Sequence, residues 1–153
     1  MTATPSAADW LLDGGLAPDV HNDLIAPLYH GSARGKLVLP FCDACDLPLD
    51  LEQRVCDGCA SSECVWKEVA PTGVVHSSTT MHRREPELVL ADGPYPIVDV
   101  ELASGHRLIM TTRDPATSAP EIGIQVGITF RTLGGVAIPA AKTIASSETE
   151  ATE

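Results

Sequence analysis

The chain has 153 residues, 44% of them hydrophobic, which is enough for one modest core and a small appendage. Its 10 Lys and Arg against 21 Asp and Glu give 10 − 21 = −11, a charge that repels phosphate backbones and argues against nucleic-acid binding. No apolar run has membrane-spanning length, and the first residues show no basic segment followed by an apolar stretch. We therefore expect a soluble protein of the reducing cytoplasm, with no membrane partner.

Changes in composition divide the chain into five predicted segments. They are a flexible arm (1–18), a helical segment (19–35), a ribbon (36–67), a barrel (68–144) and a disordered acidic tail (145–153). The arm is small, polar and rich in Gly and Pro around Trp10, Leu11 and Leu12, which predicts a loose segment with one apolar spot.

The helical segment is short and amphipathic. Asp19 is a plausible N-cap, and apolar residues recur at i, i+4 and i+8, namely Val20, Leu24 and Leu28. Pro27 is expected to bend or divide the helix. An isolated helix of this length is marginal in water, so its apolar face needs a surface, either the protein's own ribbon or a partner.

Four of the five cysteines form two Cys-x-x-Cys pairs in the stretch CDACDLPLDLEQRVCDGC, and they are Cys42, Cys45, Cys56 and Cys59. The turn within each pair points backbone amides at the sulfurs, so both sulfurs can bind one ion. Two such turns complete a tetrahedron, which predicts a closed structural zinc site with no position left for substrate. Iron in a rubredoxin-like site is the main alternative, because tetrahedral sulfur ligation suits both metals. Metal binding would supply much of the ribbon's folding free energy, on the order of 10 kcal/mol in zinc-finger peptides.

Other interpretations of the cysteines fit less well. Disulfides suit small secreted chains, but the N-terminal residues MTATPSAADW contain no secretory signal. A redox Cys-x-x-Cys is usually single, whereas this motif is doubled. Cys64 is interpreted as a reduced thiol that packs inside the protein. The second interpretation is that it serves as an alternative metal ligand.

After the ribbon, the hydrophobic period becomes that of β-strands. Four stretches are rich in β-branched residues, namely TGVVHSSTTMHR, YPIVDVELASG, HRLIMTTR and IGIQVGITFRTL. The stretch GVAIPA supplies a fifth, and ASGH predicts a tight hairpin turn with Gly105 at positive φ. The predicted fold is therefore mainly β: a helical segment, a Cys₄ zinc ribbon and a five-stranded OB-fold barrel.

The order of these pieces, from about residue 18 to residue 144, resembles the acyl-CoA-associated OB-fold family with a rubredoxin-like zinc ribbon, long catalogued as domain of unknown function 35. The sequence departs from the family pattern where ribbons place Gly after each cysteine pair, because Asp46 and Ala60 stand there. Ala adopts the left-handed conformation less readily than Asp, which predicts a distorted second knuckle. The stretch DLEQRV also lacks the family's Pro-Pro-Arg segment, but neither change removes a ligand.

The resemblance implies a non-catalytic accessory subunit of the thiolase-partner type. Such a subunit binds a thiolase or retro-aldolase acting on acyl-CoA, stabilises it and helps to position or channel the acyl-CoA, which it contacts indirectly or in a shared site. The expected assembly is a hetero-oligomer, and an accessory subunit of an acyl-CoA hydratase is an alternative. Two further alternatives are a rubredoxin-like electron carrier and a nucleic-acid-binding protein. The last is disfavoured because the barrel strands supply only Tyr95 and Phe130 as aromatics.

No catalytic residue is predicted, and the residues that would bind a cofactor are unknown. The five histidines belong to no motif, and they are His21, His30, His76, His82 and His106. His76 and His82 are six residues apart on one predicted strand and should project to the same face. The isolated chain should neither cleave nor condense acyl-CoA. In the loop RREPELVLADGPYP, Arg83 and Arg84 are candidates for CoA phosphates or a partner, against the alternative of solvated charges.

Overall fold

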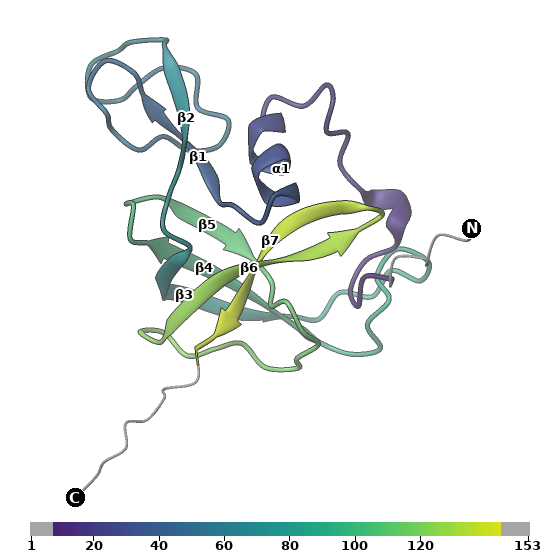
Figure 1. Ribbon diagram of the computed structural model, residues 1–153. Helices are drawn as coiled ribbons and strands as arrows, with labels where there is room; N and C mark the ends of the chain where they lie inside the picture. Colours follow the sequence, from purple (N-terminus) through teal and green to yellow (C-terminus); the bar gives the residue numbers. More distant parts are fainter. Residues whose placement is uncertain (1–7, 145–153) are drawn as a thin grey trace, which may run out of the picture.

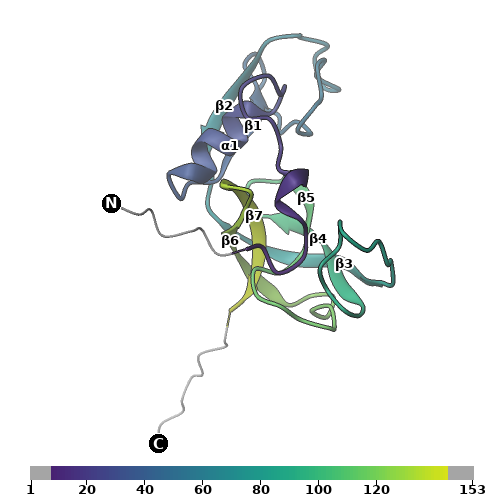
Figure 2. The same ribbon diagram turned by 90° about the vertical axis from the view of Figure 1, so that its right-hand side faces the viewer.

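A computed structural model describes residues 8–144, in which a small ribbon and one helix stand above one end of a curled sheet (Figures 1 and 2). The elements are η1 Gly14–Leu16, α1 Ala26–Ala33, β1 Val38–Cys42, β2 Cys64–Glu68, β3 Thr72–Met81, β4 Tyr95–Leu102, β5 Arg107–Met110, β6 Gln125–Leu133 and β7 Val136–Thr143. The predicted acidic tail lies outside the described residues, and the predicted segment boundaries stay predictions. No helix within residues 8–144 is long and apolar enough to cross a membrane.

Strands β3 to β7 form one antiparallel sheet in the order β5-β4-β3-β6-β7. The sheet curls until its two edges meet, because Thr112, just beyond β5, pairs in parallel with Ala141 of β7. The backbone N–H of Ala141 donates to the carbonyl of Thr111, and that of Arg113 donates to the carbonyl of Ala141, both at 2.9 Å. This arrangement resembles an OB-fold and confirms the predicted fold class.

The barrel core follows from the alternation of apolar residues along the strands. In β4 and β5, every second side chain points into the barrel and is buried. Inward-facing side chains of β3 and β6 complete this core, whose members are Val75, Val98, Val100, Leu102, Leu108, Met110, Val126 and Ile128. Burying one such side chain stabilises the fold by about 1.5–3 kcal/mol relative to leaving it in water. The hairpin between β4 and β5 turns at Gly105, whose φ of 99° agrees with the prediction.

A β-bulge in β3 changes which side chains face the core. The register with β4 shifts between Val75 and Ser77, so that His76 is the extra residue. Before the bulge the buried positions are odd-numbered, whereas after it the less exposed positions are even-numbered. The expectation that His76 and His82 share a face was therefore wrong, and His82 also lies beyond the end of β3.

The helix is shorter than predicted and begins at Ala26. Pro27 lies in its first turn, where the missing N–H removes no helical hydrogen bond, so this proline starts the helix instead of bending it. Asp19 instead caps a separate turn, because its carboxylate accepts from the backbone N–H of His21 at 2.9 Å and from the side chain of Asn22 at 3.0 Å.

The helix packs on its own protein. Leu28 is only 4% exposed and joins the barrel core, and Gly31 approaches β1 so closely that a Cβ there would lie 2.5 Å from a methyl group of Val38. Leu24, by contrast, precedes the helix and is 58% exposed. Of the predicted apolar stripe, Leu28 therefore packs inside the protein, whereas the side chain of Leu24 is exposed to solvent.

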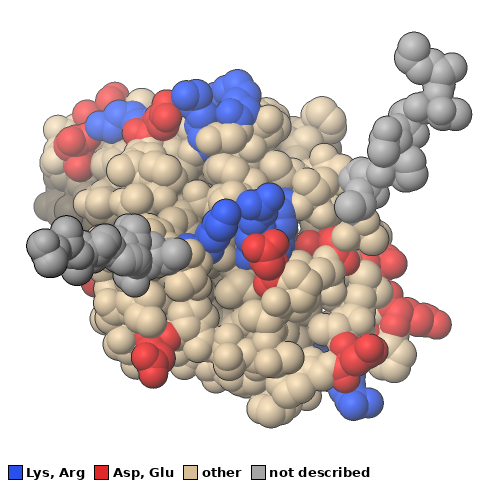
Figure 3. All heavy atoms as spheres, turned by 60° about the horizontal axis from the view of Figure 1, so that its bottom comes forward, with Lys and Arg blue, Asp and Glu red and all other residues tan. Residues whose placement is uncertain are grey.

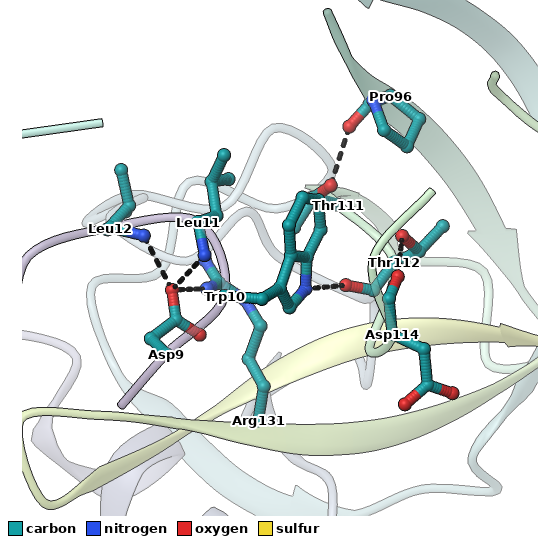
Figure 4. A network of polar contacts seen from close by, with 9 residues as sticks. All are labelled: Asp9, Trp10, Leu11, Leu12, Pro96, Thr111, Thr112, Asp114 and Arg131. Carbon is teal, nitrogen blue, oxygen red and sulfur yellow. Dashed lines mark hydrogen bonds and ion pairs between the residues drawn. The ribbon is translucent and has the colours of Figure 1, made fainter. Parts of the chain in front are cut away.

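Residues 9–12 pack against the barrel (Figure 4), whereas their composition predicts a loose arm; residues 1–7 of that arm lie outside the described residues. The carboxylate of Asp9 accepts from the backbone N–H of Leu11 at 3.1 Å and pairs with the guanidinium of Arg131 on β6. These two charged side chains are only 1% and 9% exposed. The ring N–H of Trp10 donates to the carbonyl of Thr112 at 3.2 Å. A buried carboxylate needs such partners, and they attach the segment to the sheet.

Candidate metal centre

The four cysteines of the two pairs come together at the tip of the ribbon. All four sulfur atoms lie within 4.8 Å of one another. The sulfurs of Cys42 and Cys59 are 3.6 Å apart, as are those of Cys45 and Cys56. A tetrahedral ion with metal–sulfur bonds of about 2.3 Å needs sulfur–sulfur distances of about 3.8 Å. The four residues can therefore hold one metal ion, and a set of four sulfur donors suits zinc or iron.

The two turns that carry the sulfurs have the same backbone geometry. The N–H of Asp46 donates to the carbonyl of Cys42 at 2.8 Å, and the N–H of Ala60 donates to that of Cys56 at 2.9 Å. Asp46 has a φ of 65° and Ala60 a φ of 64°. The expected distortion of the second knuckle is absent, because Ala60 adopts the left-handed conformation in place of Gly.

Backbone amides stabilise negative charge on the sulfurs. The N–H groups of Cys45 and Ala44 face the sulfur of Cys42 and lower its pKa to about 6. The N–H of Leu47 acts in the same direction on Cys45, but the adjacent sulfur of Cys56 and burial outweigh it and raise the pKa of Cys45 to about 12. The gathered sulfurs thus compete for protons. A bound cation would allow all four to be thiolates.

The first knuckle is tied to strand β2. The ammonium of Lys67 lies 2.5 Å from the carboxylate of Asp46 and 4.4 Å from the centre of the Phe41 ring. Both charged side chains are exposed, so the ion pair contributes little stability, roughly 0–1 kcal/mol. Its effect is to orient Asp46, the residue in the left-handed conformation.

His106 attaches the ribbon to the barrel, although its sequence context gave no sign of a structural role. Its buried ring places Nε2 2.8 Å from the carbonyl of Pro40 on β1 and Nδ1 2.7 Å from the hydroxyl of Ser104. The ring also meets Phe41 edge-on, with 4.9 Å between centroids. Since a carbonyl only accepts, Nε2 carries the proton in the neutral ring and Nδ1 accepts from Ser104.

The contact between Ser104 and His106 lacks the carboxylate that orients the base in a Ser-His-Asp triad. Burial lowers the pKa of His106 and disfavours the imidazolium that a general base must form, and the partner of Nε2 is a neutral carbonyl instead of a carboxylate. The serine lies in the β4–β5 turn, where the backbone N–H of His106 is also near its hydroxyl. The contact therefore belongs to the turn.

The remaining candidate residues are not among the four clustered cysteines. Four histidines are exposed, and they are His21, His30, His76 and His82. Arg83 forms an exposed ion pair with Glu85, and Arg84 lines a hollow of about 210 Å³ that Glu85 also lines. Cys64 is exposed, contrary to the packed thiol expected, although its backbone pairs with that of Cys42.

Comparisons with known proteins agree with this architecture. Residues 66–131 match the family model of the C-terminal OB-fold domain of ChsH2. The structure is similar to a chain of the solved structure described as "Ltp2-ChsH2(DUF35) aldolase", with a TM-score of 0.69 and 26% sequence identity. This similarity covers 83% of the present chain and 98% of the other. No curated protein matches the chain significantly.

Proposed function

Because the chain combines a ChsH2-type OB-fold domain with the four-cysteine ribbon of a DUF35 protein, we propose that it is a non-catalytic accessory subunit of a thiolase-like enzyme. The partner is a thiolase or a retro-aldolase that acts on an acyl-CoA substrate. The accessory chain stabilises this enzyme and helps to position or channel the acyl-CoA.

The observation that carries this proposal is the similarity to the chain of the Ltp2-ChsH2(DUF35) aldolase. It covers 83% of the present chain, whereas the barrel is only about half of it, so the similarity extends beyond the barrel to the segments that precede it. A common barrel by itself would say little about function, because OB-folds serve many unrelated proteins.

The ribbon's part in this function is structural. The four cysteines leave no coordination position for a substrate, which supports zinc as a scaffold ion. Elemental analysis of protein purified under reducing conditions should give one zinc ion per chain. One iron ion and a visible absorption band would instead support the electron-carrier alternative.

The surface supports a protein partner better than a nucleic acid. On the face shown in Figure 3, Lys and Arg form only small groups, Asp and Glu are scattered around them, and most of the face carries neither. The chain's charge of −11 would also weaken contact with phosphates.

The proposal is tested by capturing the tagged full chain from a lysate of its native host and identifying the co-purifying subunits by mass spectrometry. A thiolase-like subunit in comparable amount is the expected result. Its acyl-CoA turnover should rise or persist longer when the accessory chain is present, and the accessory chain alone should show no turnover. Recovery of nucleic acid, of an acyl-CoA hydratase, or of no partner would overturn the proposal.

A further inference from the structure

The fifth cysteine, Cys64, is paired across the ribbon with a residue of the metal centre. Strands β1 and β2 are antiparallel, and their register sets Cys64 directly opposite Cys42. Residues that are directly opposite in such a ladder present their side chains on the same face. Cys42 is buried and belongs to the four-sulfur cluster, whereas Cys64 is exposed and lies outside it. A clustered and an unclustered cysteine therefore occupy paired positions.

The backbone hydrogen bonds show which kind of pair this is. The N–H of Cys42 points away from β2 and donates to the carbonyl of Leu47 at 2.8 Å. The N–H of Asp43, the next residue, instead donates across the ribbon to the carbonyl of Glu63 at 3.0 Å. Because the two kinds of pair alternate along an antiparallel ladder, Cys42 and Cys64 form a non-hydrogen-bonded pair, with Cα atoms about 4.5 Å apart. A disulfide needs a Cα separation of roughly 4.4–6.8 Å, so the backbone has the spacing for a bond between these two residues.

Cys64 is also the cysteine that an external oxidant can reach without competing with the metal. Because it lies outside the four-sulfur cluster, its sulfur stays unligated when the cluster holds an ion. Its side chain is exposed and lines a hollow of about 310 Å³ on the ribbon, together with Pro40 and Trp66. The oxidation of a cysteine depends on exposure, and cysteines that respond to oxidants are often placed next to a second cysteine.

We propose that Cys64 is a redox modification site, which a peroxide converts into a disulfide with Cys42 and which thereby releases the metal. In the first step the O–O bond of hydrogen peroxide breaks, one oxygen is transferred to the sulfur of Cys64 to give a sulfenic acid, and one water leaves. In the second step the thiolate of Cys42 attacks this sulfur, the S–S bond forms, and the hydroxyl leaves as a second water after taking a proton from solvent. Two sulfurs lose two electrons in total, and the peroxide is reduced to water.

The new bond removes one of the four metal ligands. The ligand form of cysteine is the thiolate, and the sulfur of Cys42 carries no charge once it is part of a disulfide. Three thiolates remain, so the metal affinity falls. Because a small metal site commonly folds together with its metal, the ribbon loosens when the ion leaves. A reductant that cleaves the disulfide restores the fourth thiolate and reverses the change.

The test treats the zinc-loaded full-length chain with hydrogen peroxide. A chromophoric indicator follows the release of zinc, and digestion with mass spectrometry locates the disulfide. The wild type should release zinc and yield a peptide that links Cys42 to Cys64, and a phosphine reductant should restore zinc binding. Cys64→Ser should release zinc at least tenfold more slowly, because only direct oxidation of the ligands remains.

A matched control moves the thiol out of register. Cys64→Ser combined with Glu68→Cys keeps an exposed thiol on β2 but places it opposite Val38. This double variant should release zinc as slowly as Cys64→Ser. Under reducing conditions, all three proteins should bind one zinc and melt at the same temperature, because the substituted side chains are exposed.

Four results would overturn the proposal. Equal release rates in the wild type and Cys64→Ser would show that Cys64 has no part in the step, and fast release in the double variant would show that the register does not matter. Disulfides that join only the four clustered cysteines would place the reaction elsewhere. A loss of zinc from reduced Cys64→Ser would make Cys64 a ligand. No partner enzyme is needed in this assay, so none of these results bears on the proposed function.

Discussion

Replacing Ala60 by Gly should strengthen the ribbon. Ala60 is exposed and has a φ of 64°, a conformation that strains any residue with a Cβ. Its N–H must keep this position, because it donates to the carbonyl of Cys56 in the second knuckle. The substitution therefore removes strain and leaves the hydrogen bond in place.

The expected gain is the difference between two opposing effects. The left-handed conformation costs an L-residue about 1–2 kcal/mol. Glycine avoids this cost but loses more backbone freedom on folding, roughly 0.5–1 kcal/mol relative to Ala. The net stabilisation is therefore about 0.5–1 kcal/mol, which corresponds to about a two- to fivefold tighter metal affinity. We expect it to appear in metal binding, because a small metal site commonly folds together with its metal.

The matched control is Ala44→Gly in the first knuckle. Ala44 is exposed like Ala60, but its φ is not positive. Glycine at position 44 should therefore weaken metal binding through the entropy cost alone. Zinc affinity is measured for both variants by competition with a chromophoric chelator under reducing conditions. The reasoning fails if Ala60→Gly binds zinc no more tightly than the wild type, or if both variants change affinity in the same direction.

Two further predictions concern contacts that join distant parts of the chain. Because the pKa of His106 is lowered in the folded state, its contribution to stability is present above the unfolded pKa of about 6.5 and is lost as the pH falls through the folded value. Urea unfolding with saturating zinc between pH 5 and 8 should show this loss in the free energy of unfolding of the wild type. The free energy of unfolding of His106→Gln should depend less on pH, and an equal pH dependence in the two proteins would contradict the prediction. Asp9→Asn should lower the free energy of unfolding by about 3–5 kcal/mol, because it leaves Arg131 buried and unpaired. The double variant Asp9→Leu with Arg131→Met should recover most of this loss in urea unfolding, and no recovery would count against the ion-pair explanation.

Features that depend on neighbouring residues could be predicted from the sequence. The spacing of Cys42, Cys45, Cys56 and Cys59 predicts a tetrahedral cluster because each Cys-x-x-Cys turn is a local structure. The alternation of apolar residues predicts the strands β3 to β7 because the side-chain period of a strand is two residues. The resemblance to the family pattern located the left-handed positions Asp46 and Ala60, although the distortion expected at Ala60 is absent.

Contacts between remote parts of the chain were decided only by the tertiary structure. Asp9 and Arg131 are 122 residues apart, and His106 and Pro40 are 66 apart, so no local pattern pairs them. Each pair forms because the barrel closes and the ribbon folds back onto it. The bulge at His76 likewise arises from the pairing of β3 with β4. Burial then determines what each polar group requires: the same carboxylate or imidazole is solvated on an unfolded chain, but needs a specific partner once folding removes it from water.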